Sequence, residues 1–276
     1  MLVLLFLLGA AENRLVRAQS KDAASLTIGN TFALESKVLG ETRRINVYYP
    51  PAYTESSTVQ LPVLYMPDGG MTEDFLHVAG LLQVLVGNGT MRPFILVGIE
   101  NTERRRDLTG PTTSEKDKKI APRVGGSAAF RRFIRQELMP QIRKRYRTTT
   151  ETAIVGESLA GLFVVETLLQ EPDLFDTYLT FDPSLWWNNE QLVQQASSFL
   201  RAYTGPVKTL YVATSSEPEI ADAGRRLAEI LQATAKPVIS WHYEPMPAET
   251  HQTIYHPAAL KAFRYVFKPP ATDATK

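Results

Sequence analysis

Cysteine is absent from this sequence of 276 residues, and the formal net charge is only +1. Without cysteine, the chain has no disulfide, no thiol nucleophile and no cysteine-ligated metal site, and it is compatible with any redox compartment. A charge near zero gives no overall field that favours nucleic acid or a membrane surface. Histidine is scarce, with four residues, so each can be compared as a catalytic base. No ligand spacing typical of a metal site is present, and we expect no metal or cofactor.

Hydrophobic runs long enough to cross a bilayer are also missing. The apolar run at residues 2–11 is too short for a membrane-spanning helix, so no stable membrane insertion is expected. The run resembles the apolar part of a secretory signal, with Val16-Arg17-Ala18 as a small-x-small cleavage site, although only the amino terminus supplies positive charge before it. We therefore expect residues 1–25 to be a leader and linker, and the protein to be exported to the periplasm or beyond. It is expected in the cytoplasm if the run is not a signal.

Strand-like and helix-like segments alternate along the rest of the chain. Residues 61–66 and 93–99 are continuous apolar runs, typical of strands buried on both faces of a parallel sheet. Residues 43–49 alternate in polarity and predict a half-buried strand at a sheet edge. A helix with one apolar face is predicted over 130–142, bent or broken at Pro140, after a long loop at 104–126.

The alternation predicts one α/β domain over residues 26–270, with a tail at 271–276. The sheet is expected to be doubly wound and mostly parallel, flanked by helices. In open sheets of this kind, functional residues lie on loops at the carboxyl ends of the strands.

A strand-to-helix turn at Gly156–Gly161 is the main catalytic signal. Its sequence, Gly-Glu-Ser-Leu-Ala-Gly, places Ser158 between small residues, as in a nucleophile elbow. The match to G-x-S-x-G is imperfect, because Ala160 stands at the last glycine position and Gly161 follows it. We predict Ser158 as a nucleophile. The acidic Glu157 beside it either raises the pKa of a neighbouring histidine or points into solvent.

A serine hydroxyl needs a base, and the α/β-hydrolase chain order is serine, acid, histidine. His77 precedes the serine, His242 falls inside a predicted strand, and His256 opens the last predicted helix. His251 lies in a polar loop beyond the last predicted strand. We predict His251 as the base.

The acid is expected after the preceding strand, predicted at residues 209–214. Glu217 is the first choice because it follows the strand end by only a few residues, with Glu219 and Asp222 as alternatives. Each of the three is equally explained as a negative charge at the start of a helix.

An oxyanion hole needs two fixed N–H donors. Leu159, directly after the nucleophile, is expected to supply one. The second is expected from the loop Asp68-Gly69-Gly70-Met71, where Gly70 or Met71 is the donor.

Several segments in this order resemble the "putative esterase" branch of the α/β-hydrolases, which contains esterase D and the enterobactin-type siderophore esterases. They span residues 32–267 and are Leu64–Gly69, Val97–Asn101 with Arg106–Thr109, Phe130–Pro140, the elbow, Pro172–Phe175 with Pro183–Trp187, and His251.

The resemblance implies a carboxylic ester hydrolase acting on small acyl, aryl or siderophore-type esters, with Ser158 as nucleophile and His251 as base. It also implies substrate contacts from Asn101, Arg106, Trp186 and Trp187. Glu157 and Ala160 depart from the family pattern, which often has histidine and glycine there. Some similar enzymes work with a Ser-His pair, so an acid such as Glu217 is not required. The alternatives are an acyltransferase of the same fold and a non-catalytic ligand-binding protein.

Overall fold

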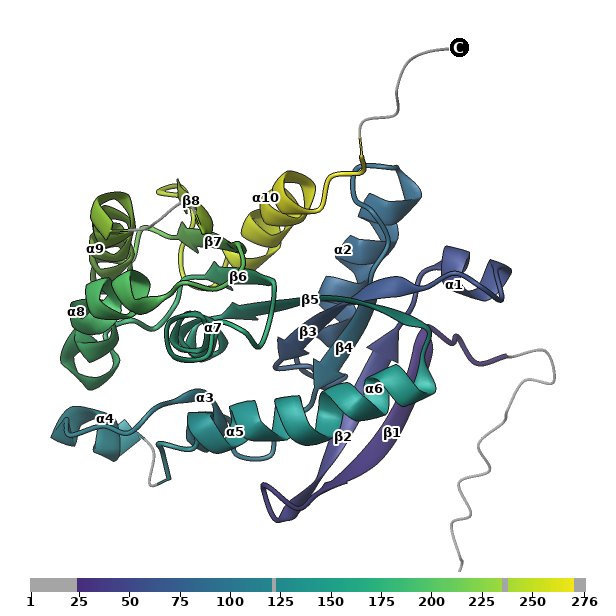
Figure 1. Ribbon diagram of the computed structural model, residues 1–276, viewed down its shortest axis with the longest axis horizontal. Helices are drawn as coiled ribbons and strands as arrows, with labels where there is room; N and C mark the ends of the chain where they lie inside the picture. The colour runs from purple at the N-terminus through teal and green to yellow at the C-terminus, as the bar shows by residue number, and fades with distance from the viewer. Residues whose placement is uncertain (1–23, 121–122, 235–237, 271–276) are drawn as a thin grey trace, which may run out of the picture.

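The computed structural model describes residues 24–120, 123–234 and 238–270. Within these residues the strands form one sheet in the order β1-β2-β4-β3-β5-β6-β7-β8 (Figure 1). The pairs β1·β2 and β2·β4 are antiparallel, and all the others are parallel. The strands are β1 (Gly29–Ser36), β2 (Glu41–Tyr48), β3 (Leu61–Pro67), β4 (Ile95–Ile99), β5 (Thr148–Glu157), β6 (Thr177–Phe181), β7 (Lys208–Thr214) and β8 (Ile239–Pro245). The predicted mostly parallel α/β architecture is confirmed.

Helices cover both faces of the sheet, each over its own apolar core (Figure 1). One face is packed by α2 and α10, and the other by the helices from α5 to α9. The helices are α1 (Pro51–Glu55), α2 (Phe75–Gly87), α3 (Arg104–Leu108), α4 (Glu115–Ile120), α5 (Ser127–Phe133), η1 (Ile134–Leu138), α6 (Met139–Arg145), α7 (Leu159–Gln170), α8 (Trp187–Ala202), α9 (Pro218–Thr234) and α10 (Tyr255–Val266). None of these helices is both long and apolar enough to span a membrane.

Strands β3 and β4 are buried along their whole length, as their continuous apolar runs predicted, and β6 is buried in the same way. The prediction of an edge strand at residues 43–49 is wrong, because β1 covers β2 on its outer side. Asn46 and Tyr48, on the supposedly exposed side, are buried. Tyr48 belongs to the core under α2, and Asn46 donates a side-chain hydrogen bond of 2.8 Å to the Gly69 carbonyl.

Three helical segments in the first two-thirds of the chain differ from expectation. Pro140 does not break its helix: α5, the π-helical η1 and α6 run on continuously, with Pro140 in the first turn of α6. The predicted loop at 104–126 contains the short helices α3 and α4. Helix α2 was not predicted, because Leu76 and Val84 are exposed apolar residues that blur the period of its buried face.

The predicted tail, 271–276, and all but the last two residues of the predicted leader, 1–25, lie outside the described residues. The strand β1 that follows the leader forms one edge of the sheet, and β8 forms the other. The parallel strands between them present their carboxyl ends at one side of the sheet, which is where the candidate site lies.

Candidate active site

Ser158 lies in a strained turn between β5 and α7. Its φ of 60° and ψ of −120° are unusual for a residue with a side chain, and they match the strained backbone of a nucleophile elbow. Gly156 and Gly161 allow the turn to be this tight. A Cβ on Gly156 would lie 2.6 Å from the Ala160 backbone, and one on Gly161 would lie 2.7 Å from the Thr180 hydroxyl. The glycines required by packing are therefore at 156 and 161, and Ala160 is accommodated, fully buried, between them.

The loop after β6 holds this turn in place. The Ser158 amide donates to the Phe181 carbonyl at 3.0 Å, and the Ser184 amide donates to the Ser158 carbonyl at 3.0 Å. The Ser184 hydroxyl also lies 3.5 Å from the Ser158 hydroxyl. The backbone of Ser158 is thus held by hydrogen bonds at both its N–H and its carbonyl group.

His251 lies in the loop between β8 and α10 and is half-buried beside Ser158. Its Nε2 is 3.2 Å from Ser158 Oγ, and its Nδ1 is 3.0 Å from Asp182 Oδ2. The Asp182 carboxylate accepts a hydrogen bond from Nδ1–H, so the Nε2 lone pair faces the serine hydroxyl. The hydrogen bond to Asp182 raises the pKa of His251, burial opposes it, and the charge of Glu157 adds to it. Ser158 and His251, both predicted from sequence, are brought together.

Asp182, and not Glu217, is the carboxylate that meets His251. Asp182 follows β6, is fully buried and has a φ of 45°. Its carboxylate also accepts hydrogen bonds from the Ser215 amide, at 2.5 Å, and from the Ser215 hydroxyl, at 2.6 Å. These contacts fix an anion opposite Nδ1.

The prediction that Glu217 contacts His251 is therefore wrong. Glu217 precedes α9, where its carbonyl accepts the amides of Ile220 and Ala221, and no hydrogen bond joins its side chain to His251 within the described part of the chain. Its charge acts on His251 only at longer range. Glu219 and Asp222 are exposed on α9 itself. Glu217 and Glu219 thus lie at the start of α9, as the competing interpretation predicted, whereas Asp222 lies beyond its first turn.

Sequence reasoning missed Asp182 because the expected acid was sought after β7, one strand too late. The available signal was an acid directly after the short segment 178–181, in Phe181-Asp182-Pro183, at the carboxyl edge where functional groups gather. The β7 loop still contributes, because its Ser215 holds the Asp182 carboxylate.

The two candidates for the second oxyanion donor differ in their hydrogen bonding. The Gly70 amide donates to the Glu73 carboxylate at 2.6 Å and is already engaged. The Met71 amide has no hydrogen-bond acceptor among the described residues. Leu159 is the first residue of α7, where opening N–H groups have no acceptor within the helix. Leu159 and Met71 are therefore the available donors.

Glu157 ends β5 and lies against the same histidine. Its Oε1 is 3.4 Å from His251 Nδ1, and this buried oxygen has no hydrogen-bond partner among the described residues. Burial raises the pKa of Glu157 to about 8. The charges of His251 and Arg104 oppose the rise, and those of Asp182 and Asp68 add to it. The side chain is turned into the site and not into solvent.

Two of the side chains predicted to contact substrate bind other side chains of the protein instead. Asn101 donates to Asp68 at 2.5 Å and to Glu73 at 2.9 Å. Arg106 pairs with Glu41 and Asp107, both at 2.7 Å. The arginine whose charge reaches Glu157 is Arg104, which also holds Asp68 through two hydrogen bonds of 2.7 and 2.8 Å.

The two tryptophans after Ser184 have different surroundings. Trp187 is buried and donates its Nε1 proton to the Gly110 carbonyl at 3.0 Å, so it anchors the segment between α3 and α4. Trp186 is only partly buried and packs against Trp187 with ring centroids 6.1 Å apart. Of the pair, Trp186 is the one with ring surface available to a ligand.

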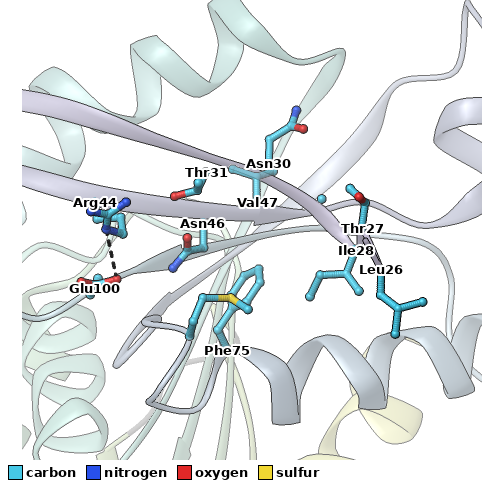
Figure 2. A pocket seen from close by; sticks show the side chains of 12 residues that line it. Leu26, Thr27, Ile28, Asn30, Thr31, Arg44, Asn46, Val47, Phe75 and Glu100 are labelled. Atoms are coloured by element: carbon cyan, nitrogen blue, oxygen red, sulfur yellow. Dashed lines mark ion pairs between the residues drawn. The ribbon is translucent and has the colours of Figure 1, made fainter. Parts of the chain in front are cut away.

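A cavity of about 450 Å³ lies between the segment 26–31, β2 and the start of α2 (Figure 2). Leu26, Ile28, Met71 and Phe75 give it an apolar wall, and the ion pair Arg44–Glu100 lies on its rim. Neither Ser158 nor His251 lines it, so the chemistry is not inside this cavity. Within the described residues, no group of three or more His, Asp or Glu side chains is placed to hold a metal ion.

Comparison with known proteins agrees with this geometry. The chain matches the family described as "Putative esterase" over residues 36–253. Ferri-bacillibactin esterase BesA of Bacillus subtilis is 28% identical over 278 residues, which covers 92% of this chain and 95% of that protein. Siderophore triacetylfusarinine C esterase of Aspergillus fumigatus is 30% identical over 58% of each chain.

Among solved structures, an IroE-like serine hydrolase from Shewanella oneidensis superimposes with a TM-score of 0.79 at 30% identity, covering 87% of this chain and 80% of that one. The siderophore hydrolase EstB from Aspergillus nidulans shares the fold, with a TM-score of 0.74 at 21% identity, over 92% and 99% of the two chains. Because the family match spans most of the sequence, this chain belongs to the "Putative esterase" family and is a carboxylic ester hydrolase of the α/β-hydrolase fold.

Proposed function

We propose that the protein hydrolyses siderophore-type esters through an acyl-enzyme on Ser158. The observation that carries this proposal is the hydrogen-bonded chain Ser158–His251–Asp182, with distances of 3.2 and 3.0 Å. A serine so arranged has its base within reach and its base oriented by a buried anion.

In the first stage, Ser158 Oγ attacks the ester carbonyl while His251 Nε2 accepts the hydroxyl proton. Asp182 keeps the Nδ1 proton facing itself and stabilises the imidazolium that forms. The N–H groups of Leu159 and Met71 receive the developing oxyanion. The alcohol leaves with the proton from His251, and water then repeats the sequence on the acyl-enzyme.

The siderophore substrate class is supported by the relatives, whose names specify ferri-bacillibactin and triacetylfusarinine C as their substrates. Arg104 lies beside the site, and its pKa is raised by the ion pair with Asp68 although burial opposes this, so it keeps its positive charge. A permanent cation suits a substrate with anionic groups.

Hydrolysis of p-nitrophenyl acetate and of a siderophore trilactone, with and without iron, tests the proposal. Wild type is expected to cleave both, and Ser158→Ala and His251→Ala are expected to lose at least ~10³-fold in kcat/KM. A fluorophosphonate is expected to label wild type at Ser158 only. Cleavage by Ser158→Ala at the wild-type rate would contradict the nucleophile, and cleavage of the small ester alone would contradict the substrate class.

We further propose that the protein is exported, with residues 1–18 removed as a signal. The support is the apolar run at 2–11 and the small-x-small site ending at Ala18. Sequencing the amino terminus of protein secreted by a bacterial host is expected to start at Gln19. An intact Met1 on protein recovered from the cytoplasm would contradict export.

A further inference from the structure

His251 Nδ1 faces two carboxyl groups, and the mechanism above uses only one of them. Asp182 Oδ2 is 3.0 Å from Nδ1, and Glu157 Oε1 is 3.4 Å from the same atom. They approach from different elements, since Asp182 follows β6 and Glu157 ends β5 directly before the nucleophile. Both belong to backbone that is fixed by the sheet.

The two carboxyl groups differ in how they are satisfied. Asp182 has Ser215 as a second partner, so both of its carboxyl oxygens accept hydrogen bonds. Glu157 Oε1 is buried and, within the described residues, has no hydrogen-bond partner, while its closest cationic atom is the imidazole nitrogen. An unsatisfied buried carboxyl oxygen costs free energy, and the position of this one beside the base points to a role there.

We propose that Glu157 is a second positioning residue for His251, which shares with Asp182 the orientation of the ring and, when it is ionised, the stabilisation of the imidazolium. The inference rests on the proposed Ser158–His251 chemistry and goes beyond it by assigning two acids to one base. No bond to Glu157 is made or broken in the reaction, and its effect passes through His251.

Other charged groups also act on Glu157 and shape the behaviour of the pair. Arg104, from α3, and the His251 ring favour its anion, whereas Asp182 and Asp68 disfavour it. Tyr255, from α10, also feels its charge, and burial holds the pKa of that phenol well above its ordinary range, so it remains neutral. Of these groups, His251 is the one whose ring nitrogen lies 3.4 Å from the Glu157 carboxyl oxygen, so the ionisations of the two groups are coupled.

The expected result is a pH profile with two coupled ionisations. When Glu157 is anionic it favours protonated His251, so free base accumulates over a wide pH range in wild type. In Glu157→Gln, which removes the charge and keeps the shape, kcat/KM is expected to rise through a single ionisation at lower pH. The plateau of kcat/KM is expected to fall by roughly 3- to 10-fold, because the ring loses one of its two orienting groups.

Loss of Asp182 provides the second measurement. In hydrolases whose histidine has one acid, an Asp→Asn change costs about 10⁴-fold in kcat. With Glu157 still on Nδ1, Asp182→Asn is expected to lose only about 10²-fold, and the double variant Asp182→Asn/Glu157→Gln is expected to lose at least ~10-fold more. Glu229→Gln, an exposed acid on α9, is the matched control and is expected to match wild type.

Wild-type and Ser158→Ala rates with p-nitrophenyl acetate separate this inference from the proposed function. If wild type hydrolyses no ester, the proposed function fails. If Ser158 is required but the Glu157→Gln profile overlays wild type, and the double variant is no slower than Asp182→Asn, the role of Glu157 is overturned. If Glu157→Gln does not fold, Glu157→Asp, which withdraws the carboxyl by one methylene, replaces it. Its pH profile of kcat/KM is expected to change in the same way, with a single ionisation at lower pH than in wild type. An unchanged pH profile refutes the inference.

Discussion

At the scale of single residues, Glu157 couples stability to pH. Burial raises the pKa of Glu157 from its ordinary 4.5 to about 8, so the folded protein holds this proton more tightly than the unfolded chain does. The contribution of this proton to the free energy of unfolding is fully present below pH 4.5 and is lost as the pH rises to about 8. Its upper limit is roughly 5 kcal/mol. Glu157→Gln, a neutral isostere, is expected to melt close to wild type at pH 5 and at a higher temperature than wild type at pH 9. Melting curves that stay parallel from pH 5 to 9 would contradict the raised pKa.

Glu217 supplies the complementary prediction about activity. Because its side chain makes no hydrogen bond to His251 among the described contacts, Glu217→Gln is expected to change kcat/KM by less than ~3-fold. The same ester assay as for Asp182→Asn measures it. A loss as large as that of Asp182→Asn would show that Glu217 replaces Asp182 during turnover.

The acids around His251 also show how much of a site a sequence can predict. Ser158 and His251 were identifiable because a motif and a chain order constrain them strongly. The acid was not, since Asp182 and Glu217 both follow strands, and the choice depends on how far each loop reaches across neighbouring strand ends. The contact of Glu157 with Nδ1 was equally inaccessible, because a residue at a strand end has two directions to face and only packing decides between them.

At the scale of elements, the close approach of α7 to β5 depends on Gly156. A Cβ there would lie 2.6 Å from the Ala160 carbonyl group, which belongs to a helix backbone and cannot rotate away. Gly156→Ala is expected to destabilise the protein by about 1–3 kcal/mol and to lower kcat, because the elbow must shift. Denaturant unfolding and the ester assay measure the two effects.

Gly80 is the matched control, since it lies inside α2 and an added Cβ meets nothing within 4 Å. Gly80→Ala is expected to stabilise by about 0.5–1 kcal/mol through helix propensity, with no change in rate. Equal effects at the two glycines would contradict the packing argument.

The helices and strands themselves were predictable where the apolar pattern was regular. The pattern failed at α2, whose apolar residues also face solvent, and at β2, where Asn46 and Tyr48 of the polar face are buried although Arg44 is exposed.

At the scale of the whole molecule, a buried ion pair connects strand β2 of the sheet to helix α3 in the layer of helices that packs on one face. Arg43, on β2, is fully buried and pairs with Asp107 of α3 and Glu41 at 2.7 Å each. Its guanidinium also lies 5.1 Å from the ring centre of Phe130 on α5. Arg106 also pairs with Asp107 and Glu41, so both carboxylates keep one cation when Arg43 is removed. Arg43→Met is therefore expected to lower the free energy of unfolding by about 1–3 kcal/mol, through the hydrogen bonds that the buried carboxylates lose. Because Asp107 adjoins the segment that Trp187 anchors, the variant is also expected to lose esterase activity at temperatures below its melting point. Arg225→Met, at an exposed ion pair on α9, is the control and is expected to match wild type in stability and in ester hydrolysis. Equal destabilisation by the two changes would show that the buried pair does not join the sheet to the helices.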